Sequence, residues 1–118
     1  MLPSGIRVVE PLGYRTSLTL QLHGAAVITD SGGVQREAAW LGTPCLVLRS
    51  ATEWVEAVAN SVGRMVVIGL DRARAAIELA RLAPAGTSQE LARARAETLD
   101  LRPAGAARRI VKALETVN

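Results

Sequence analysis

Cysteine and histidine are almost absent from this chain of 118 residues. Cys45 is the only cysteine, which excludes an intrachain disulfide, and its place in the apolar run CLVL predicts a buried structural thiol. His23 is the only histidine, so a zinc cluster of cysteine and histidine ligands is excluded. His23 precedes Gly24, an expected helix end, where an imidazole interacts favourably with the helix dipole. We therefore expect a structural or surface role for this histidine.

Long apolar runs and aromatic side chains are also scarce. No apolar run approaches the roughly 18 residues of a membrane span, and the N-terminal MLPSGIRVVE lacks the basic start and apolar middle of a signal peptide. We expect a cytoplasmic protein with no membrane partner. The aromatic residues are Tyr14, Trp40 and Trp54, too few to supply stacking platforms among 14 basic residues that are spread along the chain. A nucleic-acid partner is not expected.

The composition is that of one modest globular domain, with 49% hydrophobic and 21% charged residues. Apolar runs without alternation occupy residues 26–29, 45–48 and 65–68, and helical patterns lie between them. Strands buried on both faces and joined by helices form parallel βαβ units. We therefore predict an α/β fold with a Rossmann-like, three-layer parallel sheet.

Turn residues and helix stop signals place the other elements. A further β-rich run, Arg7–Glu10, is expected to form a strand closed by Pro11. In the helix that Asp71 is expected to cap, the apolar side chains are Ala73, Ile77 and Ala80, with Leu82 a further candidate. Helices are predicted over residues 17–22, 33–41, 53–60, 72–83, 89–99 and 104–117, with a loop at 84–88.

The stretch TDSGG, Thr29 to Gly33, lies where a buried strand ends and a helix begins. Ligands of open α/β sheets bind beyond the carboxyl ends of the strands. If Ser31 is the N-cap, Gly32 and Gly33 start the helix, and their unobstructed N–H groups together with the helix dipole suit a phosphate. The alternative is that Ser-Gly-Gly is only a tight strand-to-helix turn, and the local pattern does not decide between the two.

Glu37 stands one helical turn after Gly33. Helical side chains lean toward the N-terminus, so Glu37 leans toward the glycines. A carboxylate at this distance can accept hydrogen bonds from two sugar hydroxyls, and the pattern as a whole suggests a nucleotide. The alternative is that Glu37 is a surface residue. Asp30 would oppose an anion, and we expect it to orient the loop.

Several sequence blocks occur in the same order as in a known family. They are Pro-Leu-x-Tyr, Thr-Asp-Ser-Gly-Gly, Gly-x-Pro, and Leu-Arg followed by Thr-Glu, between about residues 7 and 71. In these blocks the chain resembles the C-terminal portion of the non-hydrolysing UDP-N-acetylglucosamine 2-epimerases. The resemblance implies a partial C-terminal domain of a glycosyltransferase-B-type fold. It also implies that the diphosphate of UDP contacts Ser31, Gly32 and Gly33, that the ribose contacts Glu37, and that Arg49, Thr52 and Glu53 are possible substrate contacts.

The family interconverts UDP-N-acetylglucosamine and UDP-N-acetylmannosamine by eliminating and re-adding UDP, without a metal or a nicotinamide cofactor. Its catalytic carboxylates lie in an N-terminal domain, and its catalytic histidine lies in a His-Arg-Arg-Glu-Asn motif. These 118 residues contain neither, and His23 is not in such a motif. We therefore expect UDP or a UDP-sugar as ligand, no cofactor, no metal, no catalytic residue and no activity of the chain alone.

The resemblance also predicts a gap in the sheet, because the chain would begin at the third strand of a 3-2-1-4-5-6 order. The strand at 26–29 would then expose an edge. We expect it to pair with Arg7–Glu10 or to be covered by oligomerisation, most simply in a homodimer, or by a complementing N-terminal chain.

Some positions depart from the family pattern. Ser17 stands where an aromatic residue usually meets the uracil, Arg36 replaces a glutamate, and Trp54 replaces an arginine. Thr52 and Glu53 match, although Ser50 with Glu53 also reads as a helix capping box. The alternatives are a non-catalytic module for nucleotide binding or oligomerisation, derived from such an enzyme, and half of a glycosyltransferase, for which no acidic donor-sugar motif is present.

Overall fold

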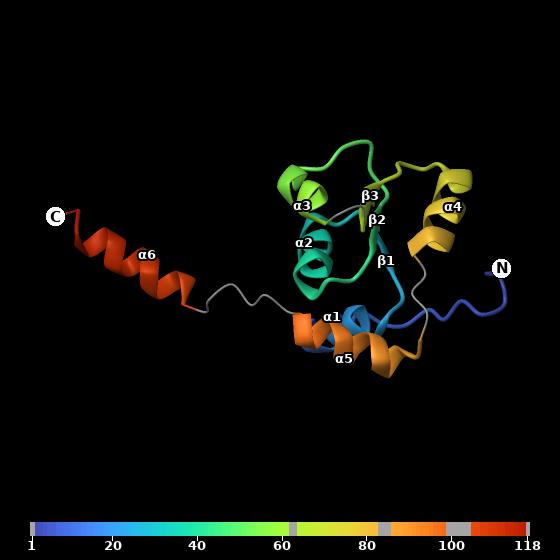
Figure 1. Ribbon diagram of the computed structural model, residues 1–118, viewed down its shortest axis with the longest axis horizontal. Coiled ribbons are helices and arrows are strands. Elements are labelled where there is room, and N and C mark those ends of the chain that lie inside the picture. Colours follow the sequence, from blue (N-terminus) through green and yellow to red (C-terminus); the bar gives the residue numbers. More distant parts are fainter. Residues whose placement is uncertain (1, 62–63, 83–85, 99–104, 118) are drawn as a thin grey trace.

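Three short parallel strands form the centre of the molecule in a computed structural model that describes residues 2–61, 64–82, 86–98 and 105–117 (Figure 1). β1 (Val27–Thr29), β2 (Cys45–Val47) and β3 (Met65–Val67) lie in the order β1-β2-β3. Leu46 is paired with Ile28 on one side and with Val66 on the other. All of β2 is buried because it has a neighbour on each side, which explains its uninterrupted apolar sequence.

Helices cover both faces of this sheet. On one face, α2 (Gly32–Leu41) and α3 (Val55–Asn60) pack around Cys45, Val47 and Met65. On the other face, α4 (Arg72–Leu82) packs on Leu46 and Ile68. The prediction of an α/β fold is therefore confirmed. A Rossmann-like parallel sheet forms the middle of three layers, with helices on both of its faces.

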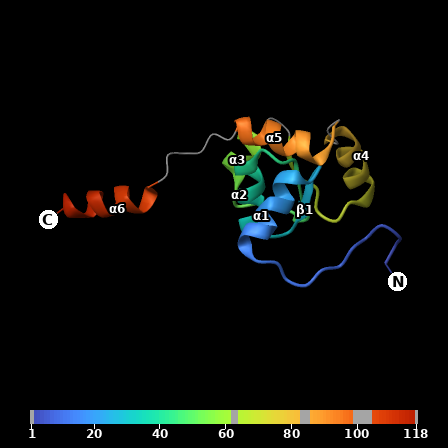
Figure 2. The same cartoon turned by 90° about the horizontal axis from the view of Figure 1, so that it is seen from below.

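Two further helices form a layer beside α2. α1 (Tyr14–His23) contacts both α2 and α5 (Ser88–Thr98), and α1 and α5 lie side by side in both views (Figure 2). Arg95 of α5 is buried and donates hydrogen bonds to the backbone oxygens of Leu22 at 2.7 Å and Gly24 at 2.6 Å. These bonds satisfy carbonyl groups at the end of α1, where the helix itself supplies no donor.

The predicted strand Arg7–Glu10 is not formed, so of the two expected arrangements the one in which it pairs with the strand at 26–29 is wrong. Residues 6–13 precede α1 without strand pairing, and Val8 and Val9 are 75% and 51% exposed. A strand needs a partner for its backbone groups, and the run RVVE meets none among the described residues. Among the described residues, β1 pairs only with β2, so the expected exposed edge of the sheet is present.

The buried face of α4 also differs from the prediction. Ala75, Leu79 and Leu82 face the sheet, whereas Ile77 is 68% exposed. Ala73 and Ala80 are exposed as well, so of the predicted stripe only Leu82 is buried. The two stripes have the same helical spacing, but the stripe with two leucines buries more apolar surface.

Asp71 caps α4 as expected. Its Oδ1 accepts the N–H of Arg74 at 2.9 Å, which satisfies one of the free donors in the first turn of the helix.

α6 (Ala106–Glu115) lies apart from the other helices and is exposed along its whole length (Figure 1). The predicted ends of helices at residues 83, 99 and 104, and part of the loop at 84–88, fall outside the described residues. Of the helices that the structure describes, none is both long enough and apolar enough to cross a membrane.

Candidate functional site

The turn between β1 and α2 is held by the side chains of Thr29 and Ser31. Ser31 is the N-cap of α2, since its Oγ accepts the N–H of Val34 at 3.4 Å, and its own N–H donates to Oγ1 of Thr29 at 3.0 Å. The first backbone hydrogen bond of the helix runs from Gln35 N–H to the Ser31 oxygen. Within the described part of the chain, the N–H groups of Gly32 and Gly33 are left without an acceptor.

The two glycines of this turn have different surroundings. A Cβ on Gly33 would meet only Oγ of Ser31, at 3.9 Å, so Gly33 faces open space. A Cβ on Gly32 would collide with Oε1 of Glu53 and would lie 3.2 Å from Nε1 of Trp54. A ligand can therefore approach Gly33, whereas the space beside Gly32 is filled by the side chains of Glu53 and Trp54.

Arg49 and Glu53 form an ion pair beside this turn. Nη1 of Arg49 lies 2.9 Å from Oε2 of Glu53, and both side chains are about half exposed. The structure thus brings two of the predicted substrate contacts to the start of α2, where they contact each other. Trp54 follows, and its indole N–H is buried with no acceptor among the described residues.

The capping box proposed for Ser50 and Glu53 is not formed, so this interpretation is wrong. α3 begins at Val55, later than the predicted residue 53, and its N-cap Trp54 makes no side-chain capping bond. The carboxylate of Glu53 is instead occupied by Arg49.

Thr52 connects the loop before α3 to α2. Its hydroxyl donates to Oε1 of Gln35 at 2.6 Å and accepts the N–H of Trp54 at 3.1 Å. Gln35 is fully buried, and its Nε2 has no partner in the described part of the chain. Because the only donor of the Thr52 hydroxyl is used internally, the position of Thr52 suits a role in holding the loop. Sequence reasoning missed Gln35, because no motif in the sequence indicates that this polar side chain is buried.

The side chain of Glu37 is oriented by α1. Nε2 of Gln21 donates to Oε2 of Glu37 at 2.7 Å, across the interface between α1 and α2. Gln21 is 7% exposed, and its backbone oxygen accepts the hydroxyl of Thr43 at 3.0 Å. Glu37 is half-buried, and the hydrogen bond from Gln21 constrains its side chain. The one sequence signal for Gln21 is a polar residue between two leucines, Leu20 and Leu22.

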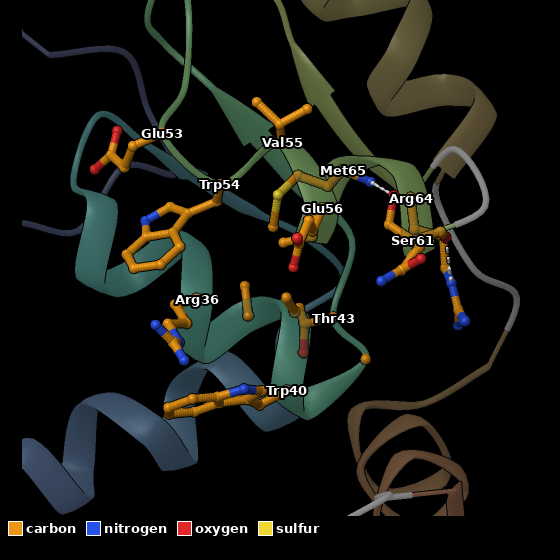
Figure 3. A pocket seen from close by; sticks show the side chains of 15 residues that line it. Arg36, Trp40, Thr43, Glu53, Trp54, Val55, Glu56, Ser61, Arg64 and Met65 are labelled. Atoms are coloured by element: carbon orange, nitrogen blue, oxygen red, sulfur yellow. Dashed lines mark hydrogen bonds between the residues drawn. The ribbon is translucent and has the colours of Figure 1, made fainter. Parts of the chain in front are cut away.

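A hollow of about 580 Å³ lies between α2 and α3 and begins at Glu53 and Trp54, next to the turn (Figure 3). Arg36 projects into it between two aromatic rings. The guanidinium carbon lies 4.6 Å from the centroid of the Trp54 ring and 5.0 Å from that of Trp40. Two of the departures from the family pattern, Arg36 and Trp54, therefore contact each other in a cation–π interaction.

The cysteine and the histidine lie away from this turn. Cys45 is fully buried in β2, as predicted, and burial raises the pKa of its thiol to about 11, so the thiol stays neutral near pH 7. His23 ends α1 as expected, with Nδ1 2.8 Å from the backbone oxygen of Thr19. Burial lowers the pKa of Arg95, and the positive charge of Arg64 lowers it further. No cluster of three or more His, Cys, Asp or Glu side chains suited to a metal ion occurs among the residues that the structure describes.

Comparison with known proteins extends the resemblance beyond the sequence blocks between about residues 7 and 71. The chain matches the profile of the UDP-N-acetylglucosamine 2-epimerase family over residues 1–115. The UDP-2,3-diacetamido-2,3-dideoxy-D-glucuronate 2-epimerase of Pseudomonas aeruginosa is 40% identical over 85 residues, which are 72% of this chain and 23% of that protein. The UDP-N-acetylglucosamine 2-epimerase of Salmonella typhimurium is 41% identical over 75 residues, which are 64% of this chain and 19% of that protein.

A third relative matches the chain at a similar level of identity. The UDP-N-acetylglucosamine 2-epimerase of Methanocaldococcus jannaschii is 44% identical over 64 residues, which are 54% of this chain and 17% of that protein. The chain thus spans about a fifth of the length of these curated relatives. No solved structure matches the chain significantly. The profile covers nearly all of the sequence, and the chain belongs to the UDP-N-acetylglucosamine 2-epimerase family.

Proposed function

We propose that this chain binds the uridine diphosphate part of a sugar nucleotide. The diphosphate would contact Ser31, Gly32 and Gly33, and the ribose would contact Glu37. The observation that carries the proposal is the pair of N–H groups on Gly32 and Gly33, which have no acceptor in the described chain. These two residues are the first of α2, and the space beside Gly33 is open. Unsatisfied donors at the positive end of a helix dipole favour a phosphate.

The names of the relatives support the nucleotide as the ligand that this segment recognises. One relative is named for UDP-N-acetylglucosamine and another for UDP-2,3-diacetamido-2,3-dideoxy-D-glucuronate. These compounds share UDP but differ in their sugars. A segment that is about 40% identical in both proteins and covers only a fifth of each suits the shared part of the two ligands better than the part that differs.

The orientation of Glu37 supports the placement of the ribose. A carboxylate that binds vicinal hydroxyls must be held in one rotamer, and the hydrogen bond from Gln21 provides this constraint. The remaining oxygen of Glu37 is then available to a ligand, because it has no hydrogen-bond partner in the described part of the chain.

The proposed role is binding and not catalysis. Inversion at a sugar carbon needs a positioned base. Near the turn, Glu37 is bonded to Gln21 and Glu53 to Arg49, while His23, in the last turn of α1, is bonded to the backbone oxygen of Thr19. We propose that the segment is the nucleotide-holding part of a glycosyltransferase-B-type epimerase. The catalytic groups would come from a complementing N-terminal chain or domain, and the isolated 118 residues would be inactive.

Calorimetric titration with UDP and with UDP-N-acetylglucosamine tests the proposal. We expect both ligands to bind, and Gly33→Val to abolish binding, because a branched side chain would cover the open N–H groups. Ala73→Val is the control, since Ala73 is exposed on α4, which packs on the face of the sheet opposite to α2. No binding at millimolar UDP, or equal binding by wild type and Gly33→Val, would refute the proposal.

A further inference from the structure

The carboxylate of Glu53 lies where the proposed site would hold phosphate. A Cβ on Gly32 would collide with Oε1 of Glu53, so this oxygen lies directly over the first residue of α2. The other oxygen, Oε2, is bound by Arg49 at 2.9 Å. One side-chain anion of the protein therefore lies at the positive end of the helix and beside a cation.

Donors from the start of α2 and from the loop between β2 and α3 lie beside this carboxylate. They are the free N–H groups of Gly32 and Gly33, the guanidinium of Arg49 from the loop after β2, and the buried indole N–H of Trp54, which has no acceptor in the described chain. The Trp54 nitrogen lies 3.2 Å from the Cβ position of Gly32. A single carboxylate leaves several of these donors unsatisfied, whereas a diphosphate has enough oxygens for all of them.

We propose that Glu53 is an internal competitor of the ligand, which occupies the phosphate position in the empty protein and leaves it when a nucleoside diphosphate binds. Arg49 then exchanges the carboxylate for a phosphate oxygen, and the indole N–H of Trp54 gains an acceptor. The inference rests on the proposed function, because it concerns the same diphosphate site. It assigns Glu53 a role opposite to that of a substrate contact, the role that the family resemblance implies.

The surroundings of Glu53 allow its side chain to move alone. Glu53 lies in the loop before α3, its side chain is 51% exposed, and in the part of the chain that the structure describes its carboxylate is hydrogen-bonded to Arg49 alone. Its neighbours are fixed. The hydroxyl of Thr52 joins the loop to Gln35 on α2, and the guanidinium of Arg36 holds the Trp54 ring. A change of rotamer at Glu53 would therefore open the site without moving the loop.

Arg49 is placed to remain when Glu53 leaves. Its backbone oxygen accepts the N–H of Gly69 at 3.0 Å, which fixes the loop after β2 to the loop after β3. A carboxylate and a phosphate cannot share this position, since like charges in contact repel each other. Binding of the ligand and displacement of Glu53 are then the same event, and the affinity for UDP is lowered by the free energy of breaking the pair between Arg49 and Glu53.

Calorimetric titration of UDP into Glu53→Gln tests the inference. We expect UDP to bind roughly three- to fivefold more tightly than to wild type, which is the scale of a solvent-exposed charge interaction. Glu56→Gln is the matched control. It removes an equal charge from an exposed carboxylate three residues away that does not contact the Cβ position of Gly32, and its affinity for UDP should equal that of wild type. Arg49→Gln should bind UDP more weakly than wild type.

The outcomes separate the inference from the proposed function. If UDP binds wild type and Glu53→Gln equally, or binds Glu53→Gln more weakly, Glu53 is not a competitor, while the proposed UDP site stands. If Glu56→Gln gains as much affinity as Glu53→Gln, the effect is one of net charge and the inference is overturned. If UDP binds neither the wild type nor any variant, the proposed function itself fails and the inference fails with it.

Discussion

The guanidinium carbon of Arg36 lies 4.6 Å from the centroid of the Trp54 ring, so a helix and a loop that the sequence separates by 18 positions are joined by a cation–π interaction. In the family pattern these two positions hold a glutamate and an arginine. Taken one at a time, the two departures suggest losses of ligand recognition. Because they contact each other, they are better explained as one exchange, in which a cation–π interaction takes the place of a possible ion pair between α2 and the loop before α3.

A double-mutant cycle on Arg36→Gln and Trp54→Leu should give a coupling free energy of about 0.5–1 kcal/mol, because the ring faces the cation at a partly exposed site. The measurement is urea unfolding of the wild type, the two single variants and the double variant. Arg64 lines the same hollow but makes neither of these aromatic contacts, so Arg64→Gln with Trp54→Leu is the matched control and should be additive. Additivity of both pairs would contradict this account.

The hydrogen bond between Gln21 and Glu37 leads to a prediction that separates stability from binding. Gln21→Met removes a buried amide whose Oε1 has no partner in the described chain, so the free energy of unfolding should change by less than about 1 kcal/mol. UDP affinity should nevertheless fall, because Glu37 loses the donor that orients it. Gln89→Met on the exposed surface of α5 is the control and should leave the affinity unchanged. Unfolding in urea and calorimetric titration measure the two quantities. Unchanged affinity in Gln21→Met would show that this bond does not prepare Glu37 for the ligand.

Local signals in the sequence are sufficient for β1, β2, β3 and the start of α2. An uninterrupted apolar run predicts a buried strand, and Ser31 followed by two glycines and closed by Gly42 bounds a helix, since Gly42 adopts a left-handed φ of 69°. These features depend on residues close together in the chain. For the same reason the turn that forms the candidate site can be located from the amino-acid sequence alone.

Contacts between distant residues explain what the sequence does not predict. The run RVVE has the composition of a strand, but strand formation depends on a neighbour that these residues do not find. Gln21 meets Glu37 from 16 positions away, and Arg95 reaches Leu22 from 73 positions away. Periodicity allows two possible faces for α4, and only the packing of Leu79 and Leu82 on the sheet selects one of them.

The buried thiol of Cys45 should make stability depend on alkaline pH. The folded protein holds the thiol neutral with a pKa of about 11, against a usual value of 9.0 that applies to the unfolded chain. The unfolded state therefore releases its proton first, and the contribution of Cys45 is fully present below pH 9 and is lost as the pH rises toward 11. The loss should be on the order of 2 kcal/mol in the free energy of unfolding.

Urea unfolding between about pH 8 and pH 11 measures this loss, and Cys45→Ala is the control because it lacks the ionisable group but keeps a small apolar side chain. The other groups that titrate in this range are common to both proteins, so the difference between the two pH profiles isolates Cys45. The wild type should lose more stability than the variant over this range. Parallel profiles would mean that the thiol is not held neutral by burial.

The free edge of β1 should pair with a second polypeptide, as the expected homodimer or complementing chain requires. Val27 donates its N–H to Pro44, and Thr29 accepts the N–H of Leu48, so both of these residues use their backbone groups toward β2. The N–H and C=O of Ile28 therefore point away from β2, and its side chain is 50% exposed. An apolar edge with free backbone groups favours strand pairing, so we expect the isolated chain to form a homodimer through β1.

Sedimentation velocity over a range of concentrations tests this prediction. A charge on the edge strand opposes pairing, so Ile28→Lys should shift the protein to monomer. Ile77→Lys is the matched control, because Ile77 is 68% exposed on α4 and takes no part in the sheet, and this variant should remain dimeric. A wild-type monomer at high concentration would refute homodimerisation. If Ile77→Lys abolished the dimer and Ile28→Lys did not, the interface would lie on α4, and the edge of β1 would be the place for the complementing chain instead.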